Sequence, residues 1–86
     1  MASRKDVYIA IDTEREYQNT IRKENEGEQR NDDEKSLSDF LLYIEFTLAK
    51  AKKDIYLLDD EEALNNVRKI AGLCVATMES FGAPKR

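Results

Sequence analysis

The chain has 86 residues and a formal net charge of −4, which leaves room for one small domain and excludes a two-domain enzyme. Charged residues (37%) nearly equal hydrophobic ones (41%), and glycine and proline are few, as is typical of a helical chain that neither spans a membrane nor forms a fibre. The absence of histidine and the presence of one cysteine exclude zinc sites, histidine-based triads and an internal disulfide. Because the chain has no basic tract, we do not expect it to bind long DNA or RNA. No hydrophobic signal segment follows Met1, so we expect a cytoplasmic protein.

The first predicted element is an amphipathic helix over residues 6–23. Its apolar side chains fall on one stripe at about 100° per residue. Glu14 and Gln18 lie in the middle of this stripe, where a plain core helix would carry leucine or valine. Two interpretations stay open: polar groups that are hydrogen-bonded at a helix crossing, or the polar wall of a pocket. The stripe consists of Val7, Ala10, Ile11, Tyr17 and Ile21.

The pocket interpretation gives this helix a candidate phosphate site. Arg15 and Arg22 lie beside the stripe, and a guanidinium group binds phosphate through two parallel hydrogen bonds. A tyrosine of the same helix is then available to stack on a base. We therefore expect a small nucleotide as the ligand, and the candidate ligand-binding residues are Tyr8, Glu14, Arg15, Tyr17, Gln18 and Arg22.

Residues 24–35 are predicted to form an acidic, flexible linker. They carry six acidic and two basic side chains, so the net charge of this segment, −4, equals the net charge of the whole chain. Because the segment holds no apolar residue, it cannot bury enough surface to order itself. Such a charge run is typical of a solvated tether, with an acidic recognition patch as the alternative.

The second predicted helix covers residues 36–55, with Ser36 as its N-cap and Asp39 as the reciprocal half of a capping box. Its apolar residues form two rows, more than one short neighbouring helix can cover. We therefore expect one row to pack within the chain and the other against a second subunit. The first row comprises Leu37, Phe40, Leu41, Ile44, Leu48 and Ala51, the second Leu42, Phe46 and Ala49, with Tyr43 on the outer side between them.

The third predicted helix covers residues 59–81. Asp59 and Glu62 suggest a second capping box, and Gly82 can end the helix in a left-handed conformation. Acids in the first turn also complement the helix dipole, with a divalent-cation cluster as the alternative for Asp59, Asp60, Glu61 and Glu62. The apolar residues predict a mostly interior helix: Val67, Ile70, Cys74 and Phe81, widened by Leu64, Ala71, Val75 and Met78.

Cys74 is then expected to be a small buried hydrophobe, since no histidine is present to activate its thiol. Taken together, the pattern predicts a single all-α domain over residues 1–86. It consists of a short N-terminal helix, the acidic linker and a long antiparallel helical hairpin, followed by a tail over residues 82–86. The apolar surplus of the second helix predicts that this unit assembles as a homo-oligomeric helical bundle.

Two segments are more specific than composition: ERxYQ at residues 14–18, and RKIAxxxVxxMExxGAPxR from Arg68 to Arg86. Together they resemble a group of small phage-encoded proteins, a group that is itself similar to the all-α nucleotide pyrophosphohydrolases of the MazG type. The resemblance covers most of the chain apart from the acidic linker. It implies a helical bundle that assembles as a homodimer or higher oligomer, with a nucleotide pocket between helices, in the cytoplasm of an infected bacterial host.

The resemblance also implies a test for hydrolysis, because MazG-type enzymes hold Mg²⁺ through E-x-x-E on one helix and E-x-x-D on the next. Here Asp39 and Glu45 are six residues apart, and the segment from Glu62 to Asn65 ends in an amide, a feeble Mg²⁺ ligand. The metal pattern is therefore not intact, and no catalytic residue or cofactor is expected. An active enzyme would have to collect Mg²⁺ with Glu14, Glu45 and Glu62.

Three hypotheses for function follow. The first is a non-catalytic phage protein that sequesters a nucleotide, or a nucleotide-derived immune signal of the host, in a pocket between helices or subunits. The second is a divergent Mg²⁺-dependent nucleotide pyrophosphohydrolase of the MazG-like kind. The third is a helical module that binds another protein through the second apolar row. No membrane and no long nucleic acid is expected as a partner.

Overall fold

The computed structural model describes residues 1–24 and 35–86, and the side chains of residues 1–21 and 35–86. Within these ranges the chain is all-helical, which confirms the predicted fold class: α1 (Arg4–Glu24), α2 (Leu37–Tyr56) and α3 (Asp60–Phe81), with no strand. Every described helix is too short or too polar to cross a lipid bilayer. The acidic linker falls almost wholly on residues 25–34 and so lies outside the described part, as does the side chain of Arg22.

Local capping chemistry decides where the first two helices begin. The Oγ atom of Ser3 accepts a hydrogen bond from the backbone N–H of Asp6 at 3.1 Å, so α1 begins two residues earlier than its apolar stripe predicts. The capping box expected at α2 is present. Ser36 Oγ accepts from Asp39 N at 3.1 Å, and Asp39 Oδ2 accepts from Ser36 N at 2.9 Å.

The ends of α3 follow the expected pattern in part. Asp59 Oδ1 accepts from Glu62 N at 3.1 Å, but the Glu62 carboxylate accepts from Asn65 Nδ2 at 3.3 Å, so the structure shows only half of the second capping box. At the C-terminal end, Gly82 has φ +119°, which only glycine adopts readily, and its N–H donates to the carbonyl of Met78 at 2.8 Å. Its ψ of 153° lies outside the left-handed helical region that the sequence predicted.

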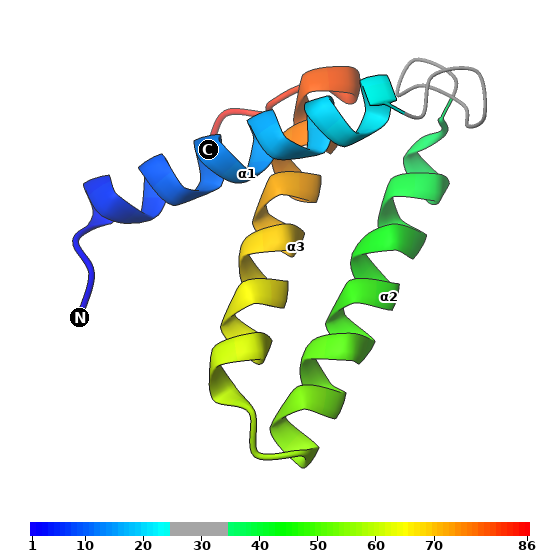
Figure 1. Cartoon of the computed structure of the whole chain (residues 1–86). Helices are drawn as coiled ribbons and strands as arrows, with labels where there is room; N and C mark the ends of the chain where they lie inside the picture. Colours follow the sequence, from blue (N-terminus) through cyan, green and yellow to red (C-terminus); the bar gives the residue numbers. More distant parts are fainter. Residues whose placement is uncertain (25–34) are drawn as a thin grey trace.

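Helices α2 and α3 form a hairpin, and α1 lies across one end of it (Figure 1). Helices α2 and α3 lie side by side and antiparallel, joined by a short turn in which Leu58 has φ +61°. Helix α1 crosses the C-terminal half of α3, and its N-terminal half extends past the hairpin. Within the described residues α1 packs on α3 and not on α2. Helix α3 therefore forms the bottom of a space between α1 and α2.

The core of the described chain is built mostly from small residues. Phe40 is the one large side chain that is fully buried, and its ring meets Tyr43 and Phe81 edge-on, with centroids 6.4 and 6.1 Å apart. The other buried apolar residues are alanines, and Glu14 and Asn66 are buried with them. The alanines are Ala51, Ala63 and Ala76.

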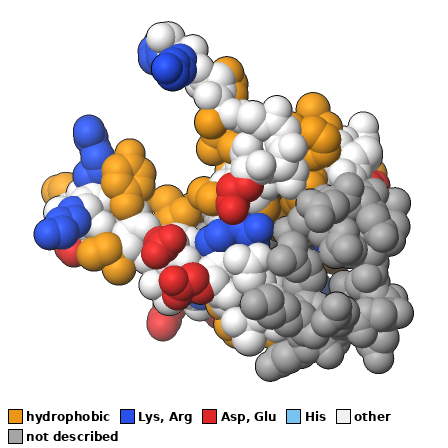
Figure 2. Space-filling view, turned by 90° about the horizontal axis from the view of Figure 1, so that it is seen from above, with side chains coloured by type: hydrophobic (Ala, Val, Ile, Leu, Met, Phe, Trp, Pro, Cys, Tyr) orange, Lys and Arg blue, Asp and Glu red, His pale blue; other side chains and the backbone are white. Residues whose placement is uncertain are grey.

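This packing corrects the expectation of a mostly interior α3. Because Ala63, Gly72 and Ala76 are the positions of α3 that face its neighbours, the helices approach closely and leave larger side chains at the edges. Cys74 is only half-buried. The view from above shows apolar side chains at the surface among charged ones (Figure 2). The exposed residues that the sequence placed on the interior face of α3 are Leu64, Val67, Met78 and Phe81. Val7 on α1 and Leu37, Leu41, Leu42, Phe46 and Leu48 on α2 are also exposed in the single chain.

Candidate functional site

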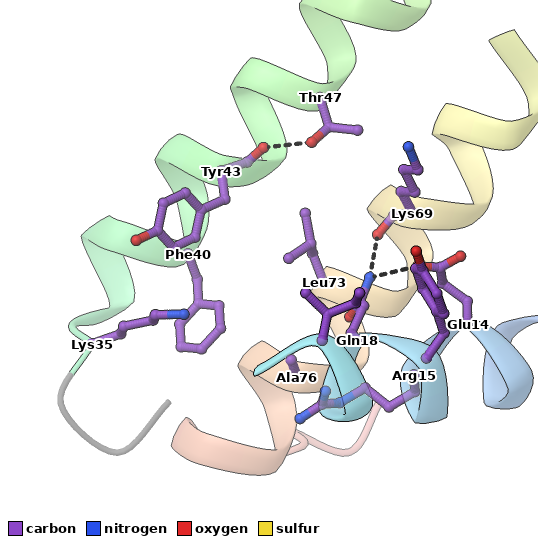
Figure 3. A pocket seen from close by; sticks show the side chains of 12 residues that line it. Glu14, Arg15, Gln18, Lys35, Phe40, Tyr43, Thr47, Lys69, Leu73 and Ala76 are labelled. Carbon is purple, nitrogen blue, oxygen red and sulfur yellow. Dashed lines mark hydrogen bonds between the residues drawn. The ribbon is translucent and has the colours of Figure 1, made fainter. Parts of the chain in front are cut away.

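A hollow of about 310 Å³ occupies the space that the three helices enclose (Figure 3). Helix α1 forms one wall, α2 with the residue before its cap forms the opposite wall, and α3 forms the floor. Each helix contributes residues three or four apart, which share one helical face. The lining residues are Glu14, Arg15, Tyr17, Gln18 and Ile21, then Lys35, Phe40, Tyr43 and Thr47, then Lys69, Leu73 and Ala76.

The wall that α1 provides is fixed to α3 by a polar contact. Glu14 is 5% exposed, and its Oε1 accepts from Arg68 Nε at 3.0 Å while its Oε2 accepts from Gln18 Nε2 at 3.1 Å. Gln18 Nε2 also lies 3.3 Å from the carbonyl oxygen of Lys69, to which it donates. The two inward polar groups of α1 are therefore hydrogen-bonded at a helix crossing, as one of the two interpretations expected.

Gly72 explains why these polar side chains can lie so close to α3. A Cβ atom built at this position would lie 2.7 Å from Gln18 Nε2 and 2.9 Å from Glu14 Cγ, both closer than real contacts allow. Any larger residue would push α1 away or displace the Glu14 and Gln18 side chains. The glycine thus sets the distance between α1 and α3 and, with it, the width of the hollow.

Arg15 makes a second link between α1 and α3. Its Nε lies 2.7 Å from Glu79 Oε1, and its side chain is only 13% exposed. The guanidinium group therefore lines the hollow as half of an ion pair near the C-terminal end of α3. A phosphate bound by Arg15 would have to compete with the Glu79 carboxylate.

The charges around the hollow are mainly positive, although the chain as a whole is acidic. Lys35 Nζ lies 5.3 Å from the centroid of the Tyr43 ring, and Lys69 is exposed with no ion-pair partner among the described residues. With Arg15 these make three cations. The one carboxylate among the described lining residues, that of Glu14, already binds Arg68 and Gln18. Among the described lining residues, cations therefore outnumber carboxylates.

The structure brings together four of the six candidate ligand-binding residues, Glu14, Arg15, Tyr17 and Gln18. Tyr8 lies elsewhere, in a separate shallow hollow on the protruding half of α1 that Arg4, Lys5, Ile9 and Asp12 also line. The side chain of Arg22 lies outside the described residues. Sequence reasoning missed the opposite wall and the floor. The spacing of Phe40, Tyr43 and Thr47 on α2, and of Lys69, Leu73 and Ala76 on α3, was the available signal.

The carboxylates required for hydrolysis do not come together. No three acidic or cysteine side chains within the described residues are placed to hold a metal ion. Glu14 meets α3 beside Gly72, whereas Glu62 lies ten residues away along the same helix, roughly 15 Å at 1.5 Å per residue. Glu45 is exposed on α2. The set Glu14, Glu45 and Glu62 therefore does not fit Mg²⁺.

Comparison with known proteins finds no match among family models, curated proteins or solved structures. The geometry of the hollow therefore carries the functional argument. It offers an apolar floor, tyrosine rings on two opposite walls and cations around them, a combination suited to binding a planar molecule that carries negative charge.

Proposed function

We propose that this chain binds a small nucleotide, or a nucleotide-derived immune signal of an infected bacterial host, and holds it without hydrolysis. The observation that carries the proposal is the charge of the hollow. Arg15, Lys35 and Lys69 line it in a chain whose net charge is −4. An acidic protein that gathers cations around one hollow, where the only carboxylate among the described lining residues is already paired, favours an anionic ligand there.

The shape of the hollow supports a nucleotide among anionic ligands. Tyr17 on α1 and Tyr43 on α2 are both partly exposed and lie on opposite walls, where a base could stack on an aromatic ring. Leu73 and Ala76 give the floor an apolar surface for the base or ribose (Figure 3). A volume of about 310 Å³ lies at the lower end of the range for small-molecule sites.

Each lining group then has a defined part in binding. Lys69 is the cation we assign to the phosphate, because it is exposed and has no ion-pair partner among the described residues. Arg15 holds the wall through Glu79 and adds positive charge at the edge. Glu14 does not contact the ligand in this proposal; it positions Gln18, whose amide lines the hollow.

Sequestration is favoured over turnover by the arrangement of the acids. Mg²⁺-assisted cleavage of a pyrophosphate needs carboxylates that converge beside the phosphates. The acids that the enzyme hypothesis requires are instead spread over three helices, and Glu14 is already used in the crossing of α1 and α3. The enzyme therefore stays the weaker alternative.

The test is calorimetric titration of the chain with mono-, di-, tri- and cyclic nucleotides and ADP-ribose, with and without Mg²⁺, followed by chromatography of the recovered ligand. Lys69→Ala is expected to weaken binding roughly tenfold, the value of one charge-assisted hydrogen bond. Lys85→Ala, in the exposed C-terminal tail, is the matched control and should leave affinity unchanged.

Metal-independent binding with recovery of intact ligand would support sequestration. A shortened product in the presence of Mg²⁺ would instead revive the pyrophosphohydrolase. The proposal fails if no nucleotide binds, or if the two lysine variants lose affinity equally. In that case the protein-binding module, which the exposed apolar rows of α2 favour, would become the leading account, and a pull-down recovering only the chain itself would count against it.

A further inference from the structure

A second cavity, an apolar groove of about 520 Å³, lies between the C-terminal half of α2 and the N-terminal half of α3. Its walls hold four large apolar side chains that are each about half exposed or more, and no residue of α1 lines it. Lys52 and Asp60 complete its edges. Apolar surface of this extent is unfavourable in water, so it is expected to be covered. The four apolar side chains are Leu48, Ile55, Leu64 and Val67.

One row of α2 runs along this groove and past its end. Its residues follow the alternating spacing of four and three that defines the seam of a coiled coil, and all are exposed. Leucine or isoleucine fills every other position, with one acid and one base between them. Such a seam fits another helix. The row consists of Leu41, Glu45, Leu48, Lys52 and Ile55.

The neighbouring row, which contains Leu42, Phe46 and Ala49, is a poorer candidate for contact. Lys50 Nζ lies 4.7 Å from the centroid of the Phe46 ring, so a cation of the same helix already covers one face of that ring. A partner helix would have to displace this lysine. The seam beside the groove has no such cover among the described residues.

We propose that the seam and groove form an interface between two copies of this chain. In it α2 packs antiparallel against α2 of the second copy, across a two-fold axis near Leu48. This symmetry places Leu41 of each copy beside Ile55 of the other, at the apolar groove. It also brings Glu45 of each copy within about one residue, roughly 1.5 Å along the axis, of Lys52 of the other.

The charges on the seam indicate both which partner binds there and whether its helix runs parallel or antiparallel to α2. Neither Glu45 nor Lys52 has an ion-pair partner in its own chain among the described residues. In a parallel pair of helices, Glu45 would face Glu45 and Lys52 would face Lys52, and both contacts are repulsive. In the antiparallel pair, Glu45 of each copy lies beside Lys52 of the other, which gives two attractive contacts. The charges of the seam are therefore complementary to those of an identical seam that runs in the opposite direction, which a second copy of the chain provides.

The small core supplies an independent reason for a partner. Four apolar residues are buried in the described chain, three of them alanines. A chain of this length gains the missing burial by association. A standard interface buries about 800 Å² per partner, and the seam with the groove provides the apolar centre for one.

The test is a charge exchange, read by size-exclusion chromatography with light scattering and by sedimentation of the full chain. The unmodified chain is expected to have twice the mass of one copy, or an even multiple of it. Glu45→Lys alone and Lys52→Glu alone each create like-charge contacts across the axis and should weaken association at least tenfold. The double variant Glu45→Lys with Lys52→Glu reverses both charges and should restore it.

Glu16→Lys, an exposed charge reversal on α1, controls for the change in net charge, and circular dichroism of each variant checks that the helices are intact. Restoration by the double variant cannot arise from a folding defect of the single ones. A monomeric unmodified chain overturns the proposal, as does an oligomer that the single reversals leave intact. An oligomer that the double variant fails to restore also overturns it. Nucleotide binding is measured separately, so failure here is distinct from failure of the proposed function.

Discussion

Arg68 on α3 donates from Nε to a carboxylate oxygen of Glu14 on α1 at 3.0 Å, and that carboxylate is almost completely withdrawn from water. Its other oxygen is satisfied by Gln18 of its own helix. A buried charge with both oxygens bonded is tolerated, whereas the same charge with a partner removed is costly. Glu14 therefore links the position of α1 to the presence of Arg68.

Glu14→Ala is expected to lower the free energy of unfolding by about 1–3 kcal/mol, because it removes the carboxylate that accepts from both Arg68 and Gln18 at the helix crossing. Urea unfolding followed by circular dichroism measures the change. Arg68→Ala should cost at least as much, because it leaves the buried Glu14 carboxylate without its cationic partner, and the double variant should show a coupling of about 1 kcal/mol. Equal effects of Glu14→Ala and Glu16→Ala, an exposed neighbour, would contradict the assignment.

Gly72→Ala tests the close approach of α1 and α3. Alanine is a better helix former than glycine by about 1 kcal/mol, so in an open position this change would stabilise α3. Here the new methyl group would meet Glu14 Cγ and the Gln18 amide, and we expect a net loss of stability together with faster hydrogen exchange in α1.

The partner variant separates steric conflict from other causes. Removing the Gln18 side chain clears the nearest of the atoms that the methyl group would strike. The pair Gly72→Ala with Gln18→Ala should therefore lose less stability than the two single changes would add up to. Strict additivity would sink the explanation.

Asn66 gives a third prediction, within the hairpin. It is 4% exposed, and its Nδ2 donates to Asp54 Oδ2 at 2.6 Å, which ties the middle of α3 to the end of α2. Asn66→Asp would replace this donor with a second carboxylate, while Asn66→Leu removes the bond without adding charge. Chemical denaturation should show that the aspartate variant is the less stable of the two, by about 1 kcal/mol or more. The reverse order would show that a second carboxylate is tolerated beside Asp54.

Leu58 gives a fourth prediction, because its φ of +61° is unfavourable for a residue with a Cβ atom. The side chain is 92% exposed, so truncation forfeits no packing. Leu58→Gly is expected to raise the free energy of unfolding by up to about 1 kcal/mol. Its neighbour Leu57, with φ −87°, is the matched control, and Leu57→Gly should be neutral or destabilising. Thermal unfolding of both variants decides the matter.

Local chemistry was sufficient to predict the helices. Ser36 with Asp39, and Gly82, are signals that act within one turn, and in the structure α2 begins and α3 ends at them. Glu14 and Gln18 were recognisable as inward-facing because they interrupt an apolar stripe. The consequence of that position depends on Gly72, far along the chain, and no pattern within α1 reveals which residue it will meet.

The opposite wall of the hollow could not be placed for the same reason. Tyr43 was assigned to the outer side of α2, because a helical wheel shows which residues share a face but not which neighbour that face meets. In the structure Tyr43 lines the hollow, since α1 crosses α3 and leaves α2 to face the gap. Leu64, Val67, Met78 and Phe81 of α3 were predicted to be interior because a wheel counts apolar positions without showing that α3 turns alanines and a glycine toward its neighbours.

The polar contact between α1 and α3 affects the heat capacity of unfolding. Heat capacity on unfolding rises with the apolar surface exposed and falls with the polar surface exposed. Release of α1 would expose Glu14, Gln18 and Arg15 at its centre, so this step should carry a heat-capacity change per residue well below that of opening the hairpin. Cooling weakens apolar packing but spares such contacts, and α1 should therefore hold to α3 in the cold while the hairpin loosens.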